Sequence, residues 1–288
     1  MGTFRRSFAL VAASWAVLRH DKELILLPVV ASIASAIAVA PFLGGAFLSS
    51  SVTGGGDGEV SVSIIGWVLL FLAYVVGAYV MIFFQSALVL AANDRMTGGN
   101  PTLGSALQMA GRNAGRILPW ALISATVSVV LQAIQERAGF IGRLVVGLVG
   151  LAWTLVTMLV LPILVIEQVG VGDALKRSAT AFKRTWGENV VGNGGVGLVG
   201  FLLFLAGLIV AGPIIAVGAS RSNVPLIVAG VALLVIWAIL VSAFSSALSA
   251  VFRTALYRYA VLGEEPGGFS HQMVAEAFRP KPGRIAAG

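Results

Sequence analysis

Long apolar stretches alternate with short charged segments along the whole chain. An α-helix needs roughly 20 mostly apolar residues to cross a bilayer, and six stretches meet this length. They cover residues 24–49, 62–92, 117–135, 144–167, 190–218 and 224–252. This pattern predicts an all-α fold, a polytopic transmembrane helical bundle with six spans.

A basic amphipathic helix is expected between the fourth and fifth spans, within Gly172–Asn193. At helical spacing, Leu175, Phe182 and Trp186 share one face, and the cations occupy the other faces. Those cations are Lys176, Arg177, Lys183 and Arg184. Such a helix lies along a membrane surface with its cations toward anionic headgroups. The four residues are candidate contacts for lipid headgroups or a protein partner, although basic clusters beside spans also simply set membrane orientation.

Similar amphipathic helices are expected before the other two pairs of spans. One covers about residues 4–18. The other covers about residues 103–117, where Arg112 and Arg116 lie opposite the apolar face and are further candidate contacts. All three helices are expected on the cytoplasmic side. Each precedes a pair of spans, so the order helix, span, span occurs three times.

The second and third of these units align at an offset of 68 residues, which places Ala106 on Ala174 and Arg116 on Arg184. We therefore predict a single transmembrane domain followed by a flexible cytoplasmic tail. The domain covers residues 1–262, with approximate repeats at 1–98, 99–168 and 169–262, and the tail covers residues 263–288.

The composition is that of a membrane protein. Of the 288 residues, 58% are hydrophobic and 11% are charged, whereas soluble domains contain about 25% charged residues. The net charge of +7 does not indicate a nucleic-acid partner, because the cations lie at the ends of spans rather than on one soluble face.

The distribution of cations predicts the orientation in the membrane. Of the 19 Lys and Arg residues, all but Arg137, Arg143 and Arg221 fall on the same side of the expected topology. The positive-inside rule therefore predicts a protein of the cytoplasmic (inner) membrane with both termini in the cytoplasm. Arg5-Arg6 before an apolar run is also typical of an export signal. Charged residues at 19–23 follow that run instead of a cleavage site, so we expect a retained helix.

Residue types that carry catalysis or bind metals are scarce. The chain has no cysteine and two histidines, His20 and His271. No nucleophile-elbow, zinc-protease or phosphate-loop motif occurs. We therefore expect no enzyme activity, no metal and no cofactor.

The polar side chains inside the spans are neutral, whereas ionisable residues such as Glu167 and Arg253 lie at the cytoplasmic ends. Candidate intramembrane polar groups are Gln85, Gln132, Asn189 and Asn193. They either line a solute path or form hydrogen bonds between helices, and the second interpretation is favoured. The sixth span contains a row of small residues, Ser242, Ser246 and Ala250, with Ser245 and Ser249 beside it. Such a row permits close helix packing or lines a polar path, and the packing interpretation is favoured. Glu167 and Glu188 flank the basic helix and are expected to pair with its cations.

Three segments resemble an uncharacterised prokaryotic membrane family, domain of unknown function family 6159. They are Ser14–Leu24, Trp186–Asn193 and Phe252–Ala260. The resemblance implies a six-span integral membrane protein, and it carries no activity or site residues.

Our leading hypothesis is a non-enzymatic membrane protein with a structural, lipid-interacting or partner-binding role. Its expected partners are membrane lipids with anionic headgroups or another membrane protein, and no nucleic acid. An alternative is a permease for a small neutral or lipophilic solute, which would use Gln85, Gln132 and Asn193. A membrane enzyme acting on lipid is a third hypothesis.

Overall fold

The computed structural model describes residues 12, 14–16, 18, 22–52, 60–185 and 190–264. Six helices in these ranges are long and apolar enough to cross a membrane, as the sequence predicted. Apart from helices, the described residues form one small hairpin of strands β1 (Ser51–Val52) and β2 (Val60–Ser61). The predicted all-α fold with six spans is confirmed.

The helices form three hairpins. In the first, α2 (Leu26–Ser49) packs along α3 (Ile64–Met96), and a short 3-10 helix η1 (Lys22–Ile25) precedes α2. In the third, α9 (Val190–Ser220) packs along α10 (Val224–Tyr257). The second hairpin consists of α5 (Ala114–Arg137), α6 (Phe140–Thr157) and α7 (Val160–Ile166). Helices α4 (Leu103–Arg112) and α8 (Val171–Thr185) connect the hairpins, and the π-helical segment η2 (Arg258–Leu262) follows α10.

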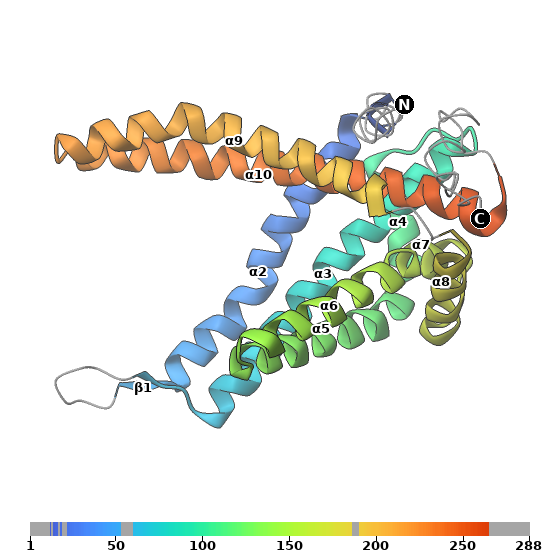
Figure 1. Cartoon of the computed structure of the whole chain (residues 1–288), viewed down its shortest axis with the longest axis horizontal. Coiled ribbons are helices and arrows are strands. Elements are labelled where there is room, and N and C mark those ends of the chain that lie inside the picture. The colour runs from blue at the N-terminus through green and yellow to red at the C-terminus, as the bar shows by residue number, and fades with distance from the viewer. Residues whose placement is uncertain are drawn as a thin grey trace, which may run out of the picture.

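The three hairpins meet at one end and diverge at the other (Figure 1). The buried core lies at the meeting end, where α2 begins, α3 ends, α5 begins, α7 ends and α10 ends. Its largest fully buried side chains include Tyr257, Leu88 and Ile117. Helices α4 and α8 pack against this end, α4 on α3 and α8 on α6 and α7.

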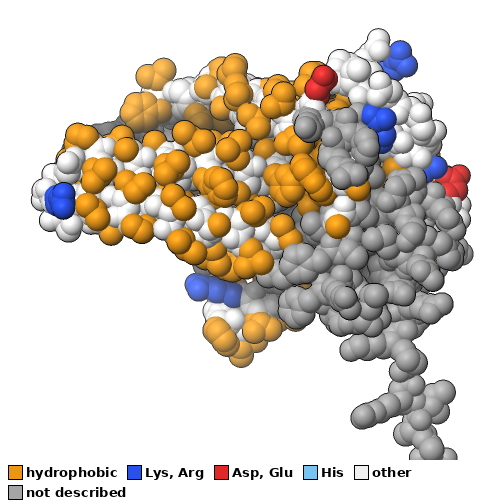
Figure 2. All heavy atoms as spheres, turned by 90° about the horizontal axis from the view of Figure 1, so that it is seen from above, with side chains coloured by type: hydrophobic (Ala, Val, Ile, Leu, Met, Phe, Trp, Pro, Cys, Tyr) orange, Lys and Arg blue, Asp and Glu red, His pale blue; other side chains and the backbone are white. Residues whose placement is uncertain are grey.

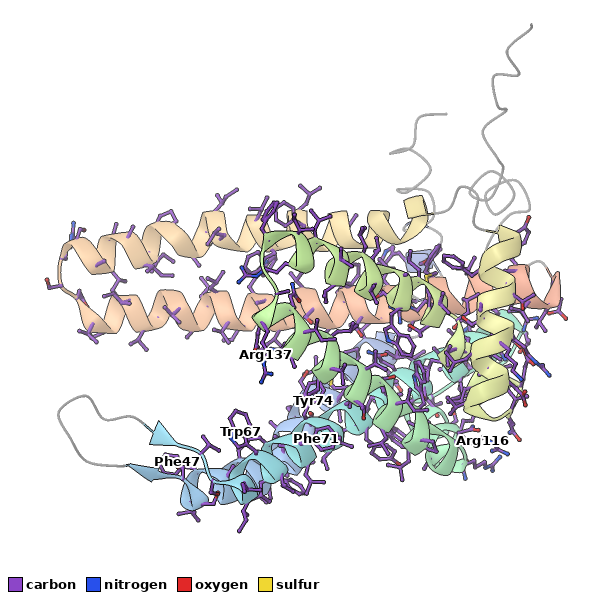
Figure 3. All side chains as sticks on the ribbon, turned by 60° about the horizontal axis from the view of Figure 1, so that its bottom comes forward. Phe47, Trp67, Phe71, Tyr74, Arg116 and Arg137 are labelled. Carbon is purple, nitrogen blue, oxygen red and sulfur yellow. The ribbon has the colours of Figure 1, made fainter. Side chains whose placement is uncertain are left out.

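The diverging arms expose apolar side chains. Phe47 and Ile64, near the free end of the first hairpin, are 80% and 85% exposed. Figure 2 shows one face of the molecule, where hydrophobic side chains cover most of the long arm formed by α9 and α10 and a Lys or Arg lies at its tip. In Figure 3, Arg137 lies at one end of α5 and Arg116 at the other, while Trp67 lies on the arm of the first hairpin. This distribution fits arms surrounded by lipid.

Small residues bring the paired helices close together. A Cβ atom built on Gly77 of α3 would lie 3.5 Å from the Ser35 hydroxyl of α2. A Cβ atom on Gly200 of α9 would lie 2.7 Å from the Ser245 hydroxyl of α10. The helix-packing interpretation of the small-residue row in the sixth span is thus supported at Ser245, and Ser35 makes the equivalent close approach in the first hairpin.

The boundary between the second surface helix and the third span differs from the sequence prediction. The surface helix expected to reach residue 117 ends at Arg112, and α5 begins at Ala114. Asn113 separates the two helices, with its side-chain amide donating to the Met109 carbonyl at 3.1 Å and its backbone N–H donating to Ala110 at 2.9 Å. The span therefore starts three residues before the predicted position, and Pro119 lies inside it.

The fourth predicted span is interrupted between α6 and α7. Proline lacks a backbone N–H, and its ring clashes with the carbonyl four residues earlier. Pro162 is the third residue of α7. The carbonyl four residues before it belongs to Met158, which lies in the interruption between α6 and α7. The sequence placed Pro162 near the end of this span but did not predict the break.

Candidate basic site on helix α8

Helix α8 is fixed to the protein by one buried face. Ala174, Ser178 and Ala181 are buried at helical spacing. The Ser178 hydroxyl donates to the Val156 carbonyl in the last turn of α6. The carbonyls of a last helical turn lack intrahelical partners, so the break after α6 supplies the acceptor that holds α8.

An ion pair also connects α8 to the end of α7. The Arg177 guanidinium pairs with the Glu167 carboxylate, as the sequence suggested. The other Glu167 oxygen accepts a hydrogen bond from the Tyr257 hydroxyl at 3.1 Å. Tyr257 is fully buried at the end of α10. Glu167 therefore connects the second hairpin, α8 and the third hairpin.

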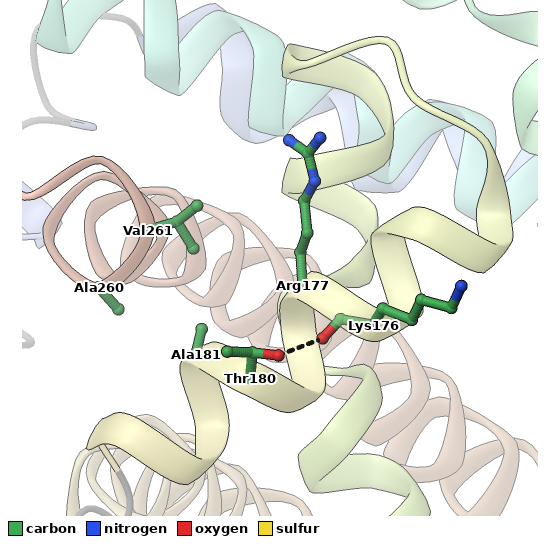
Figure 4. Close-up of a pocket in the computed structure, with 6 residues that line it drawn as sticks. All are labelled: Lys176, Arg177, Thr180, Ala181, Ala260 and Val261. Atoms are coloured by element: carbon green, nitrogen blue, oxygen red, sulfur yellow. Dashed lines mark hydrogen bonds between the residues drawn. The ribbon is translucent and has the colours of Figure 1, made fainter.

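A groove of about 240 Å³ lies between α8 and η2. Its residues are Lys176, Arg177, Thr180 and Ala181 from α8, and Ala260 and Val261 from η2. Figure 4 shows the two cationic side chains extending from α8, with the apolar Ala260 and Val261 on a neighbouring segment. The Thr180 hydroxyl donates to the Lys176 carbonyl at 2.9 Å, so it is bonded within α8. The groove thus combines apolar walls with two cations.

The predicted cationic contacts are not equivalent in the structure. Lys176 is exposed and makes no ion pair with a described residue, whereas Arg177 is paired and its side chain is 52% exposed. Arg112 and Arg116 are both exposed, and Arg116 donates to the Asn113 side chain at 3.4 Å. Lys183 and Arg184 lie in α8, but their side chains fall outside the described residues.

The structure does not bring the described intramembrane amides together. Gln85 lines a pocket between α3, α7 and α10. Gln132 is exposed on α5, and its amide donates to Glu136 at 3.3 Å. Asn189 lies outside the described residues, and Asn193 lies in α9 with its side chain outside them.

Sequence reasoning missed two residues near the site. Ser178 lies one helical turn after Ala174, which aligns with Ala106. The offset of 68 residues aligns Ser178 itself with Ala110, which is buried. That alignment could have marked Ser178 as buried. Tyr257 gave no such signal, because its partner Glu167 is 90 residues away in the chain.

No group of three or more His, Asp or Glu residues that could hold a metal ion occurs in the part of the chain described by the structure. The described geometry of the α8 groove supplies cations and apolar walls. This combination suits binding of an amphiphilic anion by charge and contact.

The comparisons with curated proteins and with solved structures found no match. A sequence model of a family of unknown function does match, over residues 64–268. This range contains two of the three segments that carried the resemblance, Trp186–Asn193 and Phe252–Ala260, and begins after Ser14–Leu24. It covers most of the six-helix unit, so the chain belongs to the family of unknown function DUF6159.

Proposed function

We propose that this integral membrane protein is a non-enzymatic component of the cytoplasmic membrane that binds anionic lipid headgroups at α8. The observation that carries the proposal is the α8 groove. There the exposed cation Lys176 lies beside apolar walls that include Ala260 and Val261. An anionic lipid presents the same combination of a charged headgroup and an apolar body.

The position of the groove supports this assignment. It lies at the end where the three hairpins meet, and the arms leading away from that end expose apolar side chains. The positive-inside rule assigns this end to the cytoplasmic leaflet, because 16 of the 19 Lys and Arg residues fall on this side of the topology predicted from the sequence. Each cation near an anionic membrane surface contributes about 1 kcal/mol of attraction.

The attachment of α8 also favours binding. Its bonds through Ser178 and Arg177 fix the helix before any lipid arrives. A site held in its binding conformation loses less entropy when it binds. Because Glu167 partly neutralises Arg177, we expect Lys176 to contribute more to headgroup attraction than Arg177 does.

The permease alternative receives less support. It requires the intramembrane amides to share a route for a solute. Gln85 lies between helices, whereas Gln132 lies on an exposed surface and is bonded to Glu136. These two amides therefore give no common path.

Lipid analysis of the purified chain tests the proposal. The chain is extracted into nanodiscs directly from its membrane, and co-purified lipids are quantified by mass spectrometry. We expect anionic lipid to be enriched over the bulk membrane. The variant that replaces Lys176, Arg177, Lys183 and Arg184 with Gln should lose most of this enrichment.

A control variant replaces Arg137, Arg143 and Arg221, the cations predicted on the opposite side, with Gln. It should retain the enrichment. Equal lipid content in the wild type, the α8 variant and the control would contradict lipid binding at α8. Co-purification of a protein in stoichiometric amount, lost in the α8 variant without a change in lipid, would instead assign the surface to a protein partner.

A further inference from the structure

A separate pocket of about 150 Å³ lies where the three hairpins meet. We call it the junction pocket. Its lining residues are Gln85 and Val89 of α3, Leu161 and Pro162 of α7, and Ser246, Ser249, Ala250 and Arg253 of α10. Each of these helices belongs to a different hairpin, and they come together at the meeting end in Figure 1.

The polar groups of the junction pocket lack partners among the residues that the structure describes. In the part of the chain that the structure describes, the side chains of Gln85, Ser246, Ser249 and Arg253 form no hydrogen bond or ion pair. The Nε atom of Arg253 is fully buried. The four residues as a whole are partly buried. Buried polar atoms ordinarily find partners, so the unpaired Nε of Arg253, beside three further unpaired donor side chains on one small pocket, points to a ligand.

No acidic residue is among the described residues that line the junction pocket. The described acids that form ion pairs are engaged elsewhere, Glu167 with Arg177 and Glu264 with Arg258. Arg253 therefore presents its positive charge without a counter-charge from the lining residues. Arg253 is partly buried. A cation held partly away from water without a counter-charge is less favourable than a paired one, so an anion is the matching occupant.

The donors identify the chemical class of that anion. A guanidinium group presents its N–H donors in a planar fork that matches phosphate or carboxylate oxygens. The amide of Gln85 and the hydroxyls of Ser246 and Ser249 add three further donor groups. Four donor side chains suit the several oxygens of a phosphate better than the two of a carboxylate.

The size and depth of the pocket narrow the choice further. Pockets for drug-sized ligands measure about 300–1,000 Å³, so the junction pocket suits a single small group. Ser246 lies 22 residues after the start of α10, or about 33 Å at the rise of an α-helix. Because the hydrocarbon core is about 30 Å thick, this level corresponds to the headgroup region.

We propose that the junction pocket binds one phosphate group, with Arg253 as its counter-charge and Gln85, Ser246 and Ser249 as neutral donors. The phosphate belongs either to a phospholipid headgroup or to a free anion. The inference does not depend on lipid binding at α8, because the two sites share no lining residue.

Thermal unfolding of the full chain in maltoside detergent, which contains no phosphate, tests this site and identifies the source of the phosphate. One arm compares added sodium phosphate with sodium chloride at equal ionic strength. The other arm compares the detergent with and without added phosphatidylglycerol. A ligand that binds only the folded state raises the Tm. A rise with sodium phosphate indicates a free anion, and a rise with phosphatidylglycerol alone indicates a lipid headgroup.

The variant Arg253→Gln should weaken the apparent affinity at least tenfold, whereas Arg112→Gln, at an exposed position on α4, should leave it unchanged. The four-residue α8 variant should also keep the response to the junction ligand, which separates this site from the α8 groove. A triple variant, Gln85→Leu, Ser246→Ala and Ser249→Ala, retains the charge and should also weaken binding. The proposal is overturned if neither probe raises the wild-type Tm, or if Arg253→Gln or the triple variant retains the full rise.

Discussion

Helices α4 and α8 occupy equivalent positions before two successive hairpins, yet they are fixed differently. At the offset of 68 residues their buried positions coincide: Ala106 with Ala174, Ala110 with Ser178, and Asn113 with Ala181. Helices α4 and α8 therefore share a pattern of burial as well as of hydropathy. It sets which face of each helix contacts the protein.

The difference between the helices lies in their polar contacts. Helix α4 is closed at its start by reciprocal hydrogen bonds between Thr102 and Ser105, which are local to the helix. Helix α8 is instead bonded to other elements, through Ser178 to α6 and through Arg177 to Glu167. The same buried register can therefore carry either a locally capped helix or a helix bonded to neighbouring elements.

The largest expected effect on stability comes from placing larger side chains at the buried positions that α4 and α8 share. Ala106→Leu and Ala174→Leu each insert a larger side chain at a fully buried position. Overpacking of this kind typically lowers the free energy of unfolding by about 1–3 kcal/mol. The loss should be about the same in both helices if their buried positions are equivalent. The measurement is the Tm of the purified chain in detergent.

The matched controls are Gly104→Leu and Gly172→Leu, which lie at the same offset on exposed positions of α4 and α8. They should change the Tm much less. A large loss at Ala174 with none at Ala106 would show that only α8 depends on its buried face.

A smaller effect is expected at the bond that distinguishes α8. Ser178→Ala removes the hydrogen bond to the Val156 carbonyl and should lower the free energy of unfolding by about 1 kcal/mol. Thr180→Ala is the control, because this hydroxyl is exposed and bonds within α8. Both are measured by thermal unfolding, and equal small effects would remove Ser178 as an anchor.

The smallest effect is expected at the ion pair of α8. Arg177 is about half exposed, and exposed ion pairs contribute roughly 0–1 kcal/mol. A double-mutant cycle with Arg177→Gln and Glu167→Gln should therefore give a coupling free energy below about 1 kcal/mol. A coupling well above that value would mean that Tyr257 and Arg177 bind Glu167 cooperatively.

Hydropathy located the spans because crossing a bilayer imposes a length and an apolar composition. The first span, predicted at 24–49, is α2 at Leu26–Ser49. Local chemistry decided the boundaries that were missed. Asn113 ends α4 early, and Pro162 is associated with the break between α6 and α7.

The junction pocket was out of reach for another reason. Gln85 and Arg253 come from helices in different hairpins, and no periodicity within one helix reports how two hairpins cross. The sequence could show that Arg253 lies near a span end. It could not show that this side chain would lie beside Gln85 without an acid.

The most direct test of lipid binding at α8 compares equal changes in charge on the two surface helices. The double variants Lys176→Gln, Arg177→Gln on α8 and Arg112→Gln, Arg116→Gln on α4 each remove two cations. Native mass spectrometry of the full chain then measures the occupancy of phosphatidylglycerol. We predict that the α8 variant loses most of the bound lipid and that the α4 variant keeps it. Equal occupancy in both variants would contradict a specific headgroup site in the α8 groove.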